Sequence, residues 1–196
     1  MGCTEARAGA VSGALFMLVS ALLSASGARA EEPCPGFNWD VSAEHALFVM
    51  APTALTAGKD HATAPPLSPG RLVQLQLAPA AAVTFAATPG RAGGGEDTFA
   101  GLATLAVPSS GAYRISVNQN LWIDVVAQGR LVPAVDYEGS RSCDSPHKIV
   151  VFHLVAGKPL VLQFSGAAQA AVRVTLTPAP VTAAPVTPAA RPTGVN

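Results

Sequence analysis

The chain has 196 residues, of which 49% are hydrophobic and 12% are charged, and its 12 basic residues balance its 12 acidic ones. The charged residues are dispersed, with neither a basic stripe nor interleaved aromatic residues. We therefore expect no nucleic acid, other polyanion or anionic membrane surface as a partner.

Residues 1–30 have the pattern of a cleaved secretory signal peptide. The apolar run over residues 10–25 leads to a small-x-small site, Ala28-Arg29-Ala30. A membrane span needs roughly 20 apolar residues, whereas this run is shorter and polar residues interrupt it. The pattern predicts export to the periplasm or the medium, and a mature chain that is not attached to a membrane. That mature chain is long enough for a single domain.

Cleavage would leave two cysteines, Cys34 and Cys143. An even number of cysteines in an oxidising compartment favours a disulfide between them. Closing a loop of about 110 residues would stabilise the fold by about 4 to 5 kcal/mol. Two free thiols are the alternative, and the absence of a Cys-x-x-Cys motif speaks against a redox site.

The first part of the mature chain predicts a short helix and a long connection. Prolines and a glycine exclude a helix before Asp40, and then Asp40 or Ser42 could cap a helix over residues 43–48. Residues 53–70 are rich in proline and glycine and resemble a surface connection.

From residue 73 onward, apolar and polar residues alternate with the two-residue period of half-buried strands. Turn residues separate eight such segments: 73–77, 82–86, 100–107, 112–117, 121–127, 148–155, 159–164 and 171–177. Short strands at this spacing favour a two-sheet sandwich or a barrel. We predict an all-β fold over residues 31–177, an antiparallel, jelly-roll-like β-sandwich with a short N-terminal helix.

The alternation also predicts which side chains face the core. A sheet with one apolar and one polar face needs only one other layer to cover its apolar face, and two such sheets packed together form a sandwich. We interpret the polar side chains of the opposite faces as solvated rather than ligand-binding; they include Arg114, Ser116, Gln163, Arg173 and Thr175. Residues 178–196 form a Pro/Ala/Thr-rich tail, which we expect to be disordered.

The sequence contains few reactive groups, and it has neither a Gly-x-Ser-x-Gly motif nor a phosphate-binding loop. The candidate metal ligands are His45, His61, His147 and His153, and none pairs with another at a short ligand spacing. Distant strands could still assemble a metal site from them. His153 lies on an apolar strand, which favours a buried, hydrogen-bonded histidine over a ligand.

Three residues are candidate ligand-binding groups: Trp39, Trp122 and Asp124. Trp122 and Asp124 share a strand face, and Trp39 precedes Asp40. An aromatic ring beside a carboxylate suits a sugar, whose C–H groups stack on the ring while its hydroxyls bind the acid. The alternative interpretation places both tryptophans in the hydrophobic core.

Two resemblances to known proteins follow from sequence motifs. The segments LVAGKPLVLQFSG (154–166) and VRVTLT (172–177) resemble the ending of bacterial pre-peptidase-type β-sandwich modules. This similarity covers about a third of the mature chain, and it implies a fold type without specifying a site.

The second resemblance spans most of the mature domain, through CPGFNWDV (34–41), ALTAGKD (54–60), LWIDVV (121–126) and PHKIV (146–150). These motifs are similar to those of small exported proteobacterial proteins, some of which carry the label homogentisate 1,2-dioxygenase. True homogentisate dioxygenases are longer cytoplasmic cupins that hold ferrous iron with two histidines and a glutamate. This chain departs from them in length, in its predicted export and in lacking that ligand motif, so no iron ligand is carried over.

These observations favour a non-catalytic binding or structural module of the cell envelope, without a cofactor and with an envelope protein or a glycan as its partner. The alternative is a metal-dependent enzyme, such as an iron dioxygenase, that uses some of the four histidines. Bound iron would distinguish the two.

Overall fold

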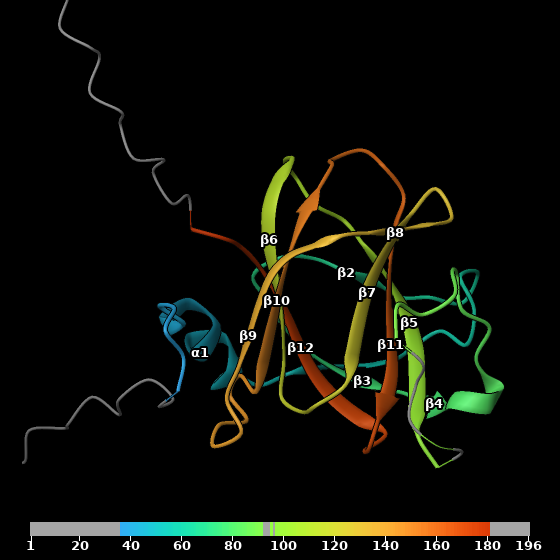
Figure 1. Cartoon of the computed structure of the whole chain (residues 1–196), viewed down its shortest axis with the longest axis horizontal. Coiled ribbons are helices and arrows are strands. Elements are labelled where there is room, and N and C mark those ends of the chain that lie inside the picture. The colour runs from blue at the N-terminus through green and yellow to red at the C-terminus, as the bar shows by residue number, and fades with distance from the viewer. Residues whose placement is uncertain (1–35, 92–94, 96, 181–196) are drawn as a thin grey trace, which may run out of the picture. The chain divides into compact units, whose positions relative to one another are not determined.

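Two β-sheets and one short α-helix make up the part of the chain that the computed structural model describes, residues 36–91, 95 and 97–180 (Figure 1). The predicted signal peptide and Cys34 lie outside these residues, and so does the tail from residue 181. The prediction of an all-β fold with a short N-terminal helix is confirmed.

The first sheet has the strand order β1-β3-β12-β6-β10-β9. Its strands are β1 (Thr53–Thr56), β3 (Leu72–Gln76), β12 (Ala171–Pro178), β6 (Gly111–Val117), β10 (Lys148–Leu154) and β9 (Ala134–Gly139). The second sheet has the order β2-β5-β11-β7-β8, with β4 also paired to β5. Its strands are β2 (Pro66–Leu67), β5 (Phe99–Leu105), β11 (Leu160–Ala167), β7 (Trp122–Ala127), β8 (Arg130–Val132) and β4 (Ala78–Pro79).

Both sheets are mixed, which corrects the expectation of a purely antiparallel arrangement. β1 pairs in parallel with β3, and β2 pairs in parallel with β5, whereas the other strand pairs are antiparallel. Parallel pairing needs a connection long enough to return the chain to the same end of the sheet. The connection over residues 57–71, between β1 and β3, is long enough for this return.

The expected strand over residues 82–86 is absent from the structure. A 3-10 helix, η1 (Ala80–Ala82), begins this segment, and the apolar residues that follow it pack on the outer face of the second sheet. There Val83 and Phe85 contact a cluster that includes Leu102 of β5 and Val161 of β11. The segment is therefore apolar because it covers a sheet, although it is not part of one.

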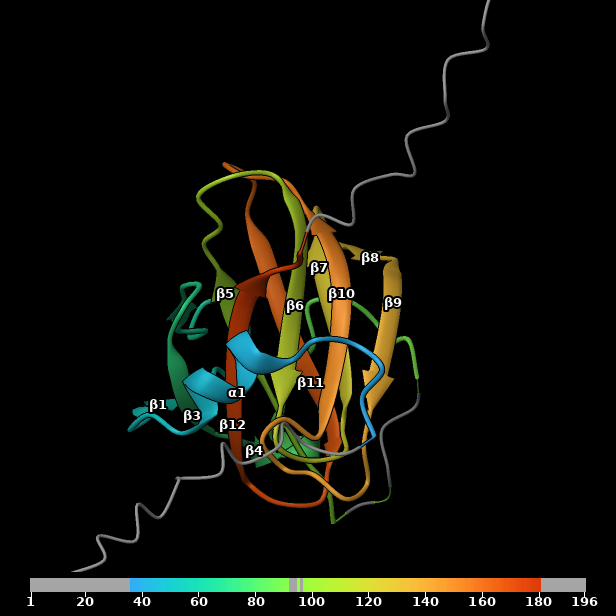
Figure 2. The same cartoon turned by 90° about the vertical axis from the view of Figure 1, so that its left-hand side faces the viewer.

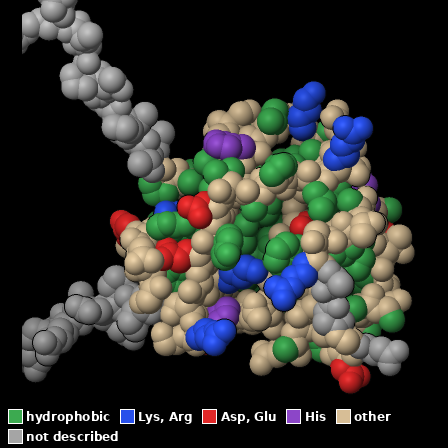
Figure 3. All heavy atoms as spheres, viewed as in Figure 1, with side chains coloured by type: hydrophobic (Ala, Val, Ile, Leu, Met, Phe, Trp, Pro, Cys, Tyr) green, Lys and Arg blue, Asp and Glu red, His purple; other side chains and the backbone are tan. Residues whose placement is uncertain are grey.

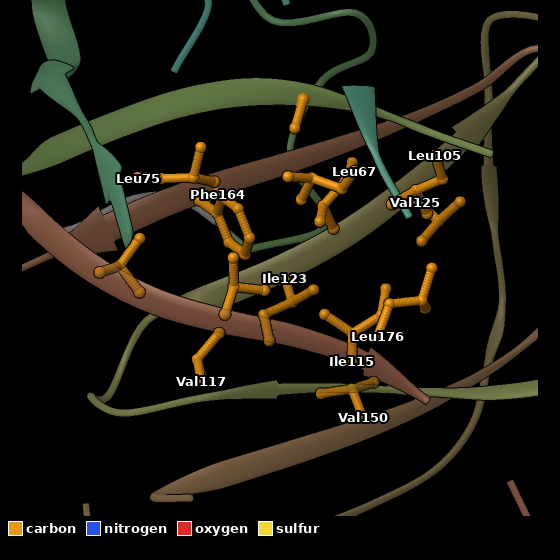
Figure 4. Packing of buried hydrophobic residues seen from close by; sticks show 14 of the residues in the cluster. Leu67, Leu75, Leu105, Ile115, Val117, Ile123, Val125, Val150, Phe164 and Leu176 are labelled. Carbon is orange, nitrogen blue, oxygen red and sulfur yellow. The ribbon is translucent and has the colours of Figure 1, made fainter. Parts of the chain in front are cut away.

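The core contains inward side chains of both sheets, as the two-residue alternation predicts. Leu75 and Ile115 come from the first sheet, Val125 and Phe164 come from the second, and all four are fully buried (Figure 4).

The polar side chains on the outer faces are also buried, so their interpretation as a solvated face is wrong for most of them. Ser116 and Gln163 are 0% and 1% exposed, and Arg114 and Thr175 are buried as well. The reason is that other segments cover both sheets. α1 (Ser42–Phe48) lies on the first sheet, against β12 (Figure 2). Residues 83–87 lie on the second sheet.

The helix forms close to its predicted position. It begins at Ser42, and the Ser42 backbone N–H donates to Asp40 Oδ1 over 2.9 Å. Hydrogen bonds from the Ser42 side chain and from this backbone N–H lower the pKa of Asp40. Its buried face carries Glu44 and Phe48.

No helix in the described part of the chain has the length and hydrophobicity that crossing a membrane requires. At the other end of the domain, β12 reaches Pro178, one residue beyond the predicted boundary.

Candidate ligand-binding site

Trp122 and Asp124 lie together at the start of β7, as the sequence predicts. The Trp122 indole Nε1–H donates to Asp124 Oδ1 over 2.9 Å. Their side chains point away from the core, because the inward positions of this strand belong to Ile123 and Val125. Trp122 is half-buried and Trp39 is also half-buried, so the alternative that places both tryptophans in the core is wrong.

The Asp124 carboxylate is buried and holds neighbouring segments in place. Its Oδ2 accepts hydrogen bonds from the Gly90 backbone N–H at 3.0 Å and from Gln163 Nε2 at 3.4 Å. Gln163 also donates to the Ala87 carbonyl at 3.0 Å. Three donors surround the carboxylate. Asp124 therefore positions Trp122 and residues 83–90, here called the covering segment, instead of accepting sugar hydroxyls as we expected.

Gly90 fits this arrangement because it lacks a side chain. A Cβ atom at this position would lie 3.0 Å from Asp124 Oδ1 and 3.2 Å from Trp122 Nε1. A side chain at this position would require the Trp122–Asp124 pair to shift by a few tenths of an ångström, so glycine suits the close approach of the covering segment.

Two cationic side chains flank the Trp122 ring. Lys148 Nζ lies 5.2 Å from the ring centroid, and the Arg91 guanidinium carbon lies 5.9 Å from it, both within cation–π range. Lys148 Nζ also donates to the Leu121 carbonyl at 2.9 Å. Partial burial and the nearby Arg91 charge lower the pKa of Lys148, while the Asp124 carboxylate acts in the opposite direction.

Beside these groups is a hollow of about 250 Å³, here called the Trp122 hollow. Its lining is Trp122, Tyr137, Arg91 and Lys148, with an apolar wall of Ile123, Ala134 and Val150. The lining comes from both sheets, because β7 supplies Trp122 whereas β9 and β10 supply Tyr137 and Lys148. Figure 3 shows hydrophobic side chains gathered between β9 and β7, with Lys and Arg side chains directly beside them.

Trp39, the third predicted ligand-binding residue, lies elsewhere. Its ring packs beneath the Arg114 guanidinium, 5.0 Å from the ring centroid, and its backbone N–H donates to Glu138 Oε2 over 3.1 Å. It does not line the Trp122 hollow. Trp39 therefore helps to attach the N-terminal segment to the first sheet.

The four histidines do not form a common cluster. His45 Nδ1 lies 3.0 Å from the Ser145 carbonyl oxygen, and His147 Nδ1 lies 3.0 Å from the Cys143 carbonyl oxygen. His61 is exposed, and His153 is exposed as well, which corrects the expectation of a buried histidine. Within residues 36–91, 95 and 97–180, no three His, Cys, Asp or Glu residues are grouped as metal ligands. The metal-enzyme alternative stays a prediction, which elemental analysis of the purified protein would test.

Sequence reasoning missed Arg91, Tyr137 and Lys148. Their positions in the chain carry no shared motif, and only the pairing of β9 with β10 brings two of them together. In that register Val150 lies opposite Tyr137, and Lys148 lies opposite Gly139. Lys148 begins a segment that the alternation predicts as a strand, whereas Tyr137 lies within β9, which the alternation does not predict.

A scan against protein-family models finds no family that matches this chain, and a search of curated proteins finds no match either.

Proposed function

We propose that the protein is an exported, non-catalytic binding module of the cell envelope, and that it recognises a glycan in the Trp122 hollow. The observation that carries this proposal is the hollow itself, where two aromatic rings, Trp122 and Tyr137, stand beside an apolar wall. Aromatic faces in a concave, mostly apolar site suit the C–H faces of sugar rings, and a few polar groups then fix orientation.

For the fold we propose an eight-stranded jelly-roll sandwich with added edge strands. The strand orders β3-β12-β6-β10 and β5-β11-β7-β8 support it. Along the chain, β3, β5, β6 and β7 alternate between the sheets, as do β10, β11 and β12. Jelly rolls include lectin domains, although the fold alone does not determine function.

The state of the carboxylates supports a binding role over a hydrolytic one. Asp124 is enclosed by its three donors, and the Glu138 carboxylate accepts bonds from Asn38 and from the Trp39 backbone N–H. A two-carboxylate glycosidase needs an acid and a base or nucleophile that reach the scissile bond. Here both carboxylates hold the protein's own backbone.

A glycan array probed with the purified protein tests this function. We expect at least one glycan to bind, and Trp122→Ala to abolish that binding while circular dichroism shows an intact fold. Trp39→Ala is the matched control, since Trp39 lies outside the hollow and should leave binding intact. Binding that survives Trp122→Ala would refute the site, and an array without any binder would refute the function.

A further inference from the structure

We infer that the Trp122 hollow is one end of a longer groove that binds an acidic oligosaccharide, with sugar carboxylates held by Arg91, Lys148 and Arg141. This inference rests on the proposed glycan-binding function and specifies the ligand class. It also departs from the expectation that the dispersed charges of the sequence leave no place for a polyanion.

The groove consists of two adjoining hollows. Next to the Trp122 hollow lies a more open one of about 570 Å³, and both are lined by Tyr137 and Lys148. The second hollow also contains Asn120, Arg141 and His147. A ligand that fills one hollow and continues past the shared pair enters the other. This arrangement suits a chain of several sugar rings better than a single sugar.

The fold gathers cations that are far apart in the sequence. Arg91 precedes β5, Arg141 follows β9 and Lys148 begins β10, yet all three line the two hollows. Among the described residues that line these hollows, Glu138 is the acidic one. Its Oε1 accepts from Asn38 N and Nδ2 at 2.6 and 2.7 Å, so its charge is directed to the N-terminal segment.

The two aromatic rings favour a sugar as the ligand that carries the carboxylate. Tyr137 is 72% exposed at the junction of the hollows, and Trp122 is held in place by Asp124. Rings spaced along a groove can each stack on a pyranose face, while the carboxylate of a uronate reaches a neighbouring cation. A carboxylate near Arg91 and Lys148 would also favour the charged form of Lys148, against the burial and the Arg91 repulsion that lower its pKa.

The test compares two probes with the same skeleton, tetragalacturonate and its fully methyl-esterified, uncharged form. Isothermal titration calorimetry on the purified full chain should show the acid binding about tenfold or more tightly than the ester. Arg91→Gln and Lys148→Gln should each weaken the acid several-fold, and added salt should do the same. Arg130→Gln is the matched control, because Arg130 is exposed on β8 and lines neither hollow.

The outcomes separate this inference from the proposed function. Equal binding of acid and ester would overturn the acidic ligand class and leave glycan binding intact. Equal affinity for galacturonate monomer and tetramer would overturn the two-hollow groove. Tighter binding of an oligothymidylate of equal charge, or no binding of either sugar probe, would also overturn the inference, and the glycan array then decides the function separately.

Discussion

At the scale of single residues, Asp124 shows how a side chain that is typical of a ligand site can serve as internal support. Its carboxylate joins the Trp122 indole on its own strand to Gly90 in the covering segment and to Gln163 on β11. A buried carboxylate is costly unless donors satisfy it, and here three donors do so. The same bonds fix the ring that we propose as the sugar platform.

Replacement of Asp124 by asparagine should therefore loosen both the fold and the ring. Because an amide offers one acceptor oxygen, a donor among Gly90 N–H and Trp122 Nε1–H loses its partner. We expect the free energy of unfolding to fall by about 1–3 kcal/mol in urea titrations. We also expect the Trp122 indole N–H resonance to shift. Asp97→Asn, at an exposed residue, should change stability by no more than about 0.5 kcal/mol, and an unshifted indole resonance in Asp124→Asn would contradict this role.

The lowered pKa of Lys148 predicts how the free energy of unfolding depends on pH. Burial and Arg91 hold its folded-state pKa below the ordinary value of 10.5, while in the unfolded chain the pKa returns to that value. At pH values between these two pKa values, Lys148 binds more protons in the unfolded chain than in the folded one. In this pH window the lysine therefore makes the free energy of unfolding rise with pH. Arg91→Gln should raise the Lys148 pKa and narrow the window.

The measurement for this prediction is an NMR titration of ¹³C-labelled lysine side chains. The control is Arg130→Gln, since Arg130 is not among the charges that act on Lys148. A Lys148 pKa that is the same in Arg91→Gln as in the wild-type protein would show that burial alone causes the shift.

At the scale of elements, α1 depends on the sheet beneath it. A helix of seven residues is too short to be stable alone in water. Its Glu44 is 1% exposed, accepts a hydrogen bond from Thr177 Oγ1 at 2.6 Å and lies 3.4 Å from Arg114 Nη1. Arg114 also donates to the Asp40 carbonyl at 2.7 Å. This polar cluster, together with buried Phe48, attaches the helix to the first sheet.

Removal of one member of this cluster should release the helix. Glu44→Ala leaves the Arg114 charge buried without its carboxylate, which we expect to cost about 3–5 kcal/mol in denaturant unfolding. The double variant Glu44→Ala/Arg114→Ala should cost less than the sum of the two single variants, because it leaves no unpaired charge. Ala46→Gln, on the exposed side of the same helix, is the control and should have little effect. Strict additivity in this cycle would show that the two residues do not act as a pair.

The elements that the sequence predicts correctly are those whose own pattern determines them. β6, β11 and β12 alternate apolar and polar residues along their length, and their inward residues are the buried core. β1 and β2 are short and form through pairing with distant strands, so their local sequence resembles a connection.

The buried outer faces follow the same principle. Nothing in the alternation of β11 indicates that residues 83–87 will cover it, yet Gln163 bonds to Ala87 from there. The site residues likewise fall into a predictable and an unpredictable group. Trp122 and Asp124 are two positions apart on one strand, so the sequence predicts that they lie together. Lys148 and Tyr137 meet only through the pairing of β9 with β10.

At the scale of the whole molecule, the beginning of the described chain is attached to its late part. Asn38 and Trp39 bond to Glu138 on β9. Gly36 lies so close to Ser140 that a Cβ atom on the glycine would be 2.8 Å from the serine Oγ. Gly36 is two residues from Cys34 and Ser140 is three residues from Cys143, so the described backbone approaches close to both predicted disulfide partners.

This proximity supports the last prediction, a Cys34–Cys143 disulfide. Thiol titration of the protein recovered from the periplasm or the medium, denatured without reductant, should find no free thiol. Cys143→Ser should lower the free energy of unfolding by up to about 4–5 kcal/mol, because the unfolded chain then regains the freedom of a loop of about 110 residues. Cys3→Ser is the matched control: Cys3 belongs to the predicted signal peptide, so its loss should leave both measurements unchanged. Two titratable thiols would contradict the bridge, and the N-terminal segment would then be held by Glu138, Glu44 and Phe48 without a covalent link.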